Sequence, residues 1–275
     1  MSERTVSFLL AAASRSLLLR DRLSGRMKKS FASFALEKER IILWSAGRGL
    51  SAVYVSAGED APVFLICHGI AERVEYWGDV QALLKTMGVS SLVFNYTGFG
   101  ASRGNVKVGY CEEDAIAAYS ELKRRGAKTV FLLGYSMGSG VASAVASRVD
   151  VDGVILCEGF SSLCAGANAA GLPRWLSLLA KDIWPTTKHL AGLKVPVLVI
   201  HSDEDELFPL SMAEEMARAC KSNGEKIVVQ GLAHNEPIFA ATPTYWRSIV
   251  DWSKRQARGQ SSTEHDSEKK SRRAW

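Results

Sequence analysis

The 275-residue chain is predicted to be an α/β protein with a mostly parallel central sheet and helices on both faces of that sheet. Short apolar runs alternate with longer segments whose apolar residues have helical spacing, which is the pattern of successive strands and helices. Several runs, such as PVFLIC at 62–67, have no polar side, as expected of strands that are covered on both faces. Strands and helices in alternation form parallel βαβ units.

The elements are predicted in order along the chain. Two strands at 40–45 and 50–56 flank a glycine-containing turn and indicate an antiparallel hairpin at the N-terminal edge of the sheet. Further strands are expected at 62–67, 91–96, 129–133, 154–157, 195–201 and 226–229. Helices are expected at 73–86, 112–125, 138–149, 211–221 and 243–255. The second of these begins with acidic residues and ends with basic ones, which complements the helix dipole.

The composition excludes some classes of protein. A hydrophobic fraction of 47% with 23% charged residues supplies enough apolar surface for a folded core, and no apolar run is long enough for a polytopic membrane protein. The net charge of +5 belongs to the chain ends, because residues 1–40 carry +5 and residues 253–275 carry +4, which leaves −4 for the rest. This distribution argues against a nucleic-acid partner and leaves open a weak attraction of the basic termini to a membrane surface.

The cysteines predict a reducing compartment. There are five, and none has the Cys-x-x-Cys spacing of zinc or redox sites. We therefore expect free thiols, no metal and a cytoplasmic protein. The apolar stretch at 5–20 is interrupted by Arg15 and does not resemble a secretory signal. It has some features of an organelle transit peptide, but an amphipathic helix that docks on the domain or on a membrane is the favoured interpretation.

The chain is divided into three regions. Residues 1–39 are an N-terminal extension, residues 40–255 form one domain, and residues 256–275 are predicted to be a disordered basic tail. Within the domain, 158–194 is too long for a simple crossover and is predicted to be a short cap insertion over the carboxyl ends of the strands. The alternative is an ordinary crossover helix that buries its apolar residues in the core. In the cap interpretation, an apolar pocket above those strand ends is lined by Leu176, Leu178, Leu179 and Ile183.

The segment GYSMG at 134–138 carries the clearest chemical signal. It follows the strand TVFLL and opens a helix of small residues, which is the context of a serine nucleophile on a strand-to-helix turn. Gly134 and Gly138 would remove the steric clashes that such a sharp turn creates. The alternatives are a glycine-rich turn without catalytic function or a phosphate-binding loop, although no Gly-Lys-Ser/Thr is present. Ser136 is thus the candidate nucleophile.

A serine nucleophile requires a base and an acid that orients it. His234 lies in a loop between the last strand and the last helix, where it can reach over a serine at the carboxyl ends of the strands. The other histidines are His68, His189, His201 and His265. For the acid, the segment HSDEDELFP at 201–209 follows an apolar strand and offers four carboxylates.

This last segment resembles the H-G-x-x-D-x-x-V-P motif of the α/β-hydrolase superfamily, with serine in place of the glycine and phenylalanine in place of the valine. The resemblance covers about residues 40–252. It assigns the acid to Asp205, with Asp203 as the alternative, and the order Ser136, Asp205, His234 is that of the superfamily. It also implies that residues 40–255 form an α/β-hydrolase domain.

A second matching segment is CHGI at 67–70, which resembles the His-Gly turn that supplies an oxyanion donor in this superfamily. The resemblance implies an oxyanion hole made by the backbone N–H groups of Ile70 and Met137. Gly69 supports the turn, and His68 is expected to brace this loop rather than to act in catalysis. Among superfamily members, the chain looks most like small-capped serine hydrolases related to monoacylglycerol lipases, protein depalmitoylases and serine aminopeptidases.

The resemblance implies a serine hydrolase that cleaves carboxylic esters or thioesters through an acyl-enzyme. The expected partner is a small-molecule acyl ester or thioester, and no metal or organic cofactor is implied. Two alternatives are kept. One is a peptidase or acyltransferase with the same triad, and the other is a non-catalytic binding protein with the hydrolase fold. The complete set of serine, histidine and aspartate argues against the second.

Overall fold

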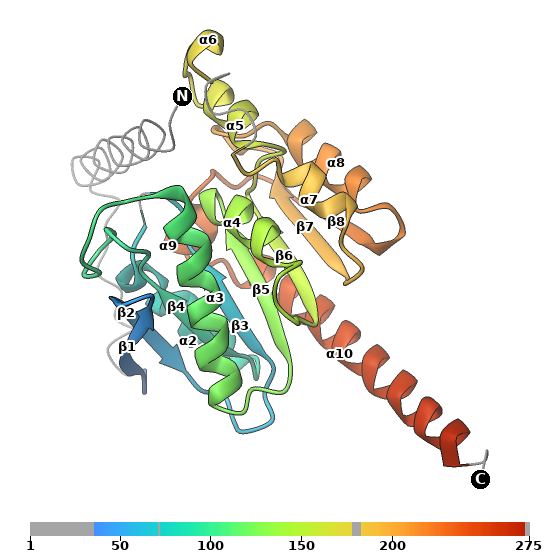
Figure 1. Ribbon diagram of the computed structural model, residues 1–275. Helices are drawn as coiled ribbons and strands as arrows, with labels where there is room; N and C mark the ends of the chain where they lie inside the picture. The colour runs from blue at the N-terminus through green and yellow to red at the C-terminus, as the bar shows by residue number, and fades with distance from the viewer. Residues whose placement is uncertain (1–35, 71, 178–182, 273–275) are drawn as a thin grey trace.

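The computed structural model describes residues 36–70, 72–177 and 183–272 (Figure 1). They form an eight-stranded sheet in the order β1-β2-β4-β3-β5-β6-β7-β8. The β1–β2 and β2–β4 pairs are antiparallel, and all other neighbours are parallel. The structure therefore confirms the mostly parallel sheet with an antiparallel hairpin at its N-terminal edge.

The strands follow the apolar runs of the sequence. Every residue is buried in the five central strands, which are β4 (Ser90–Phe94), β3 (Val63–Cys67), β5 (Val130–Tyr135), β6 (Gly153–Cys157) and β7 (Val197–Ser202). Burial alternates or is partial in the outer strands, which are β1 (Glu39–Ser45), β2 (Arg48–Val55) and β8 (Gly224–Val229). Strands with two covered faces can be apolar throughout, whereas edge strands keep a polar side.

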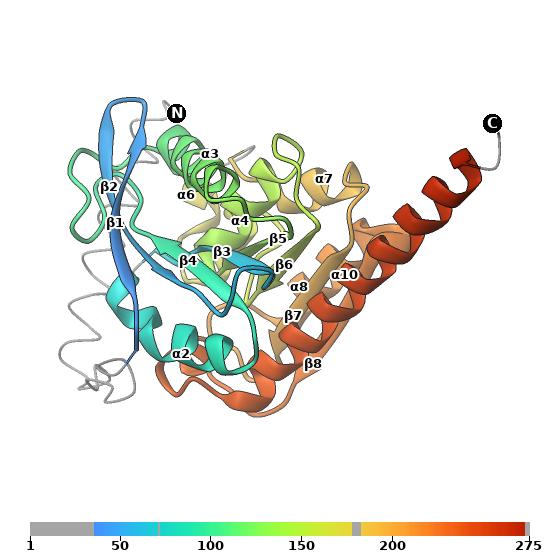
Figure 2. The same cartoon turned by 90° about the horizontal axis from the view of Figure 1, so that it is seen from below.

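Helices cover both faces of the sheet (Figure 2). One face packs against α2 (Gly78–Thr86), α9 (Glu236–Phe239) and α10 (Pro243–Arg272), with the 3₁₀ turn Val74–Trp77 beside them. The other face packs against α3 (Val108–Arg124), α4 (Met137–Val145), α7 (Thr186–Ala191) and α8 (Leu210–Ala219). A short 3₁₀ helix, Lys221–Asn223, joins α8 to β8. The two apolar clusters form the core.

The interval 158–194 contains α5 (Leu163–Ala169), α6 (Arg174–Ser177) and α7. In Figure 1, α5 and α6 project from the body of the molecule. Trp184 anchors the end of this interval, because its buried ring donates a hydrogen bond from Nε1 to Glu112 on α3 at 3.1 Å. Ile183 packs partly buried against the core, whereas the side chains of Leu176, Leu178 and Leu179 lie outside the described part. The predicted apolar pocket in the cap therefore stays a prediction.

The C-terminal region differs from the sequence prediction. We expected disorder over 256–275, but α10 continues as a helix to Arg272 (Figure 1). After Pro243 this segment contains no further proline and a single glycine, and it carries charges of both signs that can pair along a helix.

The predicted N-terminal extension lies almost entirely outside the described residues. In the described part, no helix combines the length and the apolar character needed to cross a bilayer.

Candidate active site

Ser136 lies on the sharp turn between β5 and α4. Its backbone has φ +50° and ψ −119°, a conformation that costs an L-residue roughly 1–3 kcal/mol. A Cβ on Gly134 would overlap the carbonyl group of Gly138, and a Cβ on Gly138 would overlap the carbonyl of Cys67. The two glycines therefore permit the turn, as the sequence pattern predicts.

Hydrogen bonds hold this turn in place. The N–H of Ser136 donates to the carbonyl of Cys157 at 2.9 Å, which ties the turn to the neighbouring strand β6. The N–H and the hydroxyl of Ser139 both donate to the carbonyl of Ser136, at 2.9 and 2.7 Å. Because α4 begins at Met137, the positive end of its dipole lies at the hydroxyl of Ser136.

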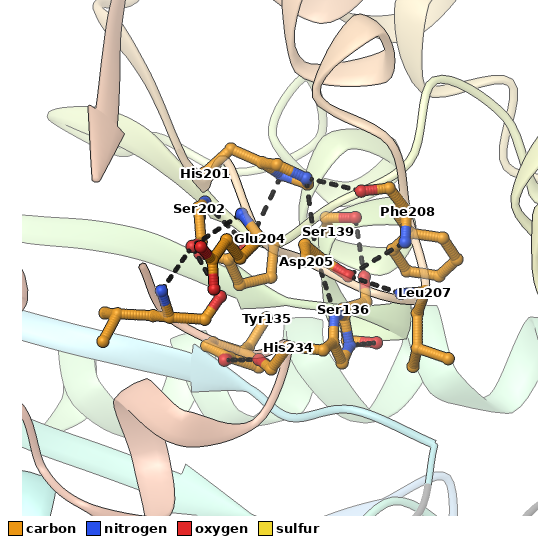
Figure 3. A network of polar contacts seen from close by, with 12 residues as sticks. Tyr135, Ser136, Ser139, His201, Ser202, Glu204, Asp205, Leu207, Phe208 and His234 are labelled. Atoms are coloured by element: carbon orange, nitrogen blue, oxygen red, sulfur yellow. Dashed lines mark hydrogen bonds and ion pairs between the residues drawn. The ribbon is translucent and has the colours of Figure 1, made fainter. Parts of the chain in front are cut away.

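The structure brings the three predicted catalytic side chains into one hydrogen-bonded row (Figure 3). The Oγ of Ser136 lies 2.9 Å from Nε2 of His234, and Nδ1 of His234 lies 2.7 Å from Oδ2 of Asp205. These contacts match a tautomer with the proton on Nδ1, which donates to the carboxylate while Nε2 accepts from the serine hydroxyl. Ser136 keeps 7% of its surface exposed, and His234 keeps 1%.

The backbone around His234 is fixed from two sides. Its N–H donates to the carboxylate of Glu206 at 2.8 Å, and the hydroxyl of Tyr135 donates to its carbonyl. The ring of Phe208 lies edge-on to the imidazole, with ring centroids 5.2 Å apart. These contacts restrict the loop between β8 and α9, so the imidazole is held in one orientation.

Asp205 and Asp203 have different surroundings. Oδ1 of Asp205 accepts from the N–H groups of Leu207 and Phe208, at 2.8 and 2.9 Å. Burial opposes ionisation of Asp205, but the hydrogen bonds from His234 and Phe208 outweigh it and hold the pKa of this carboxyl below its ordinary value. Asp203 instead accepts from the N–H of Gly231 at 2.8 Å. The geometry therefore places Asp205, not Asp203, against the histidine.

The proposed oxyanion loop lies beside the serine. A Cβ on Gly69 would stand 3.2 Å from Cβ of Ser136, so Ile70 follows the point where this loop approaches the nucleophile. His68 is fully buried, its Nδ1 lies 2.7 Å from the carbonyl of Gly69, and its ring lies 4.6 Å from that of Tyr96. Burial lowers the pKa of His68 to about 4, so the ring is neutral and braces the loop.

A further acidic side chain, Glu158, was not among the residues predicted from sequence. It follows β6 directly and is fully buried, and its carboxylate lies close to both Asp205 and His234. The ligand-type atoms of these three residues all lie within 4.8 Å of one another. Both ring nitrogens of His234 already face Asp205 and Ser136, so His234 has no ring nitrogen left to bind a metal ion in this cluster. The feature of the sequence that could have indicated Glu158 is its position directly after the apolar strand β6.

Comparisons with known proteins agree with this architecture. Residues 58–191 match the family model described as serine aminopeptidase, S33. An uncharacterized protein of Mycobacterium tuberculosis is 29% identical over 66% of this chain and 66% of its own length. Human protein ABHD12B is 28% identical over 71% of this chain and 61% of its own. The lysophosphatidylserine lipase ABHD12 of Danio rerio is 26% identical over 60% and 50%. The matches thus span less than two thirds of these relatives.

Solved structures show the same fold. An esterase of Pyrococcus furiosus superposes with a TM-score of 0.68 at 21% identity, covering 83% of this chain and 94% of that one. Est1E of Butyrivibrio proteoclasticus, with ferulic acid bound, gives 0.65 at 18% identity, covering 81% and 99%. With the sheet order and the serine turn between β5 and α4, these matches show that the chain has the α/β-hydrolase fold.

Proposed function

We propose that this protein is a serine hydrolase that cleaves carboxylic esters or thioesters through an acyl-enzyme. The observation that carries the proposal is the row from Asp205 through His234 to Ser136, with contacts of 2.7 and 2.9 Å at the end of a strained strand-to-helix turn. A binding protein has no physical need for an activated serine in this arrangement. The names of the Danio rerio lipase and the Pyrococcus furiosus esterase point to the same substrate class.

In the proposed reaction, Oγ of Ser136 attacks the acyl carbonyl while Nε2 of His234 takes the hydroxyl proton. The imidazolium formed in this way is stabilised by Asp205, whose carboxyl is ionised because its pKa is held down. His234 then returns the proton to the leaving oxygen or sulfur. Water attacks the acyl-enzyme by the same route and releases the acid.

The negative charge of the tetrahedral intermediate requires donors near Ser136. We assign this role to the backbone N–H groups of Ile70 and Met137, with the N-terminal end of α4 adding its dipole. Removing one such donor in other serine hydrolases costs roughly 10²–10³ in kcat.

All five cysteines are free thiols in the described residues, which supports our further proposal of a cytoplasmic location.

A fluorophosphonate probe tests the proposal. It should label the purified protein, and Ser136→Ala should abolish both labelling and hydrolysis of p-nitrophenyl esters. Ser143→Ala is the matched control, because Ser143 lies on the same helix but bonds to Gly140 and His189, away from the catalytic row. Labelling that persists in Ser136→Ala would overturn the mechanism. Turnover of aminoacyl amides or transfer to an alcohol, in place of ester hydrolysis, would instead favour a peptidase or an acyltransferase.

A further inference from the structure

Glu158 is held in an unusual backbone conformation directly behind the catalytic row. It has φ +45°, which L-residues rarely adopt, and its N–H donates to the carbonyl of Ile200 on β7 at 3.1 Å. The side chain is completely buried. The mechanism above does not use this carboxyl group, so its placement against Asp205 requires its own explanation.

The two carboxyl oxygens of Glu158 have different partners. Oε1 accepts from the hydroxyl of Tyr245 at 2.9 Å and from the N–H of Ser202 at 3.1 Å. Oε2 lies 3.0 Å from the same N–H, and 3.7 Å from Nδ1 of His201. A carboxyl oxygen of Glu158 also lies within 4.8 Å of a carboxyl oxygen of Asp205. Both oxygens share the N–H of Ser202, and Oε1 accepts from Tyr245 as well, so Oε2 has fewer donors and is the oxygen on which we place a proton.

Among the described residues, no cation neutralises this pair of carboxyl groups. Nε2 of His201 lies 2.9 Å from the carbonyl of Phe208 and can bond to it only as a donor. Nδ1 of His201 then carries the lone pair, and it has no hydrogen-bond partner among the described residues. Burial also lowers the pKa of His201, so its ring is neutral. Since Asp205 is ionised, a proton on Glu158 avoids a second buried negative charge.

We propose that Glu158 is a positioning residue that carries a proton at neutral pH and, as a neutral donor to Asp205, holds that carboxylate against His234. This inference rests on the proposed function. The relay then extends from Tyr245 through Glu158, Asp205 and His234 to Ser136. The surroundings of Glu158 support the assignment. Burial raises its pKa most, and the negative charge of Asp205 raises it further, to about 9.

The proposal predicts a particular response to alkaline pH. Ionised Glu158 would lose its donor hydrogen and repel Asp205, which would weaken the contact with Nδ1 of His234 and lower kcat. The titratable groups that face Glu158 come from β5, β6, β7, α10 and the loops that follow β7 and β8; they are Tyr135, Cys157, His201, Tyr245, Asp205 and His234. Burial raises the pKa of Tyr135, Cys157 and Tyr245 well above their ordinary values, so they stay neutral through this range.

The first test is the pH profile of kcat and KM for a neutral ester. The wild type should lose kcat with an apparent pKa near 9, with little change in KM. Glu158→Gln keeps a neutral donor but cannot ionise, so this alkaline loss should disappear. Tyr245→Phe removes a hydrogen bond that favours the ionised form, so the loss should move to higher pH. The matched control is Tyr119→Phe, whose hydroxyl bonds to the carbonyl of Asp150 elsewhere in the fold.

The second test does not depend on turnover. The Nδ1 proton of His234, assigned in NMR spectra by its loss in His234→Gln, should shift with the same apparent pKa in the wild type and not in Glu158→Gln. An identical alkaline profile in both proteins, or none in the wild type, would overturn the role of Glu158. A protein that shows the NMR titration but hydrolyses no ester and is not labelled by the probe would instead contradict the proposed function.

Discussion

The carbonyl oxygen of Cys67, at the end of β3, lies directly against the Cα of Gly138 in the first turn of α4. No side chain fits between the two backbones. This close approach brings the loop after β3 beside the serine turn, where Gly69 lies next to Ser136. The absence of a side chain at Gly138 therefore allows the loop that carries Ile70, the proposed oxyanion donor, to lie beside the proposed nucleophile Ser136.

Gly138→Ala should consequently damage both stability and activity. Its Cβ would overlap backbone atoms, which cannot move as the end of a side chain can, so a loss of roughly 1–3 kcal/mol or more is expected. Urea unfolding and ester turnover measure the two effects. Gly192→Ala is the control, because its Cβ would meet only the carbonyl of His189, at an ordinary 3.6 Å. Equal stability of the two variants would show that the approach of β3 to α4 is not rigid.

The catalytic acid is tested by comparing two aspartates that are two residues apart. Asp205→Asn removes the negative charge that faces Nδ1 of His234 and favours the wrong tautomer of the imidazole, which can lower kcat by about 10⁴. Asp203→Asn should have a small effect, because an amide oxygen can still accept from the N–H of Gly231. Steady-state kinetics on one ester gives both values. The reverse ranking would assign the acid to Asp203.

The sheet could be predicted from sequence because its strands are buried on both faces and therefore apolar throughout. The runs at 62–67 and 129–133 correspond to β3 and β5 within one or two residues. The short helices α5, α7 and α9 could not be predicted, since each is seven residues or fewer and is fixed by contacts distant in sequence. The C-terminal helix was predicted too short, because composition alone does not distinguish a charged helix from a disordered tail.

The row of catalytic side chains could be anticipated because each residue lies in a short motif. Ser136 has its glycines, and Asp205 has the segment around it. Glu158 has no such motif: its importance depends on the parallel pairing of β6 with β7, which places it beside Ser202 and near Asp205. His201 shows the same limit, because its fully buried ring contacts Phe208 only in the folded chain.

Glu158 should also make stability depend on pH. Its pKa is 4.5 in an unfolded chain and about 9 in the folded one, so between these values the folded state holds one more proton than the unfolded state. The stabilisation is therefore full below the unfolded pKa and declines as pH rises toward the folded pKa. The slope for one group is at most about 1.4 kcal/mol per pH unit.

Glu158→Gln removes this dependence, because an amide does not titrate. The melting temperature of the variant relative to wild type should rise steadily from mildly acidic to alkaline pH. Thermal unfolding at a series of pH values measures the difference. Asp152→Asn is a useful comparison, since burial also raises the pKa of Asp152, far from the catalytic row at the start of β6. A constant difference between Glu158→Gln and wild type at every pH would mean that Glu158 is ionised throughout.

The last prediction concerns where α10 stops contributing to the fold. Truncation after Arg255 should leave kcat/KM on a small ester unchanged and the melting temperature nearly so, because residues 256–258 have no buried side chain. Truncation after Asp251 is the contrasting variant. It removes Trp252, which is 1% exposed and lies 5.8 Å from the ring of Phe131, and it should cost about 3–5 kcal/mol or prevent folding. Calorimetry and ester kinetics compare the two proteins. A marked loss of activity or stability in the protein truncated after Arg255 would mean that the end of α10 packs against the body or against a second molecule.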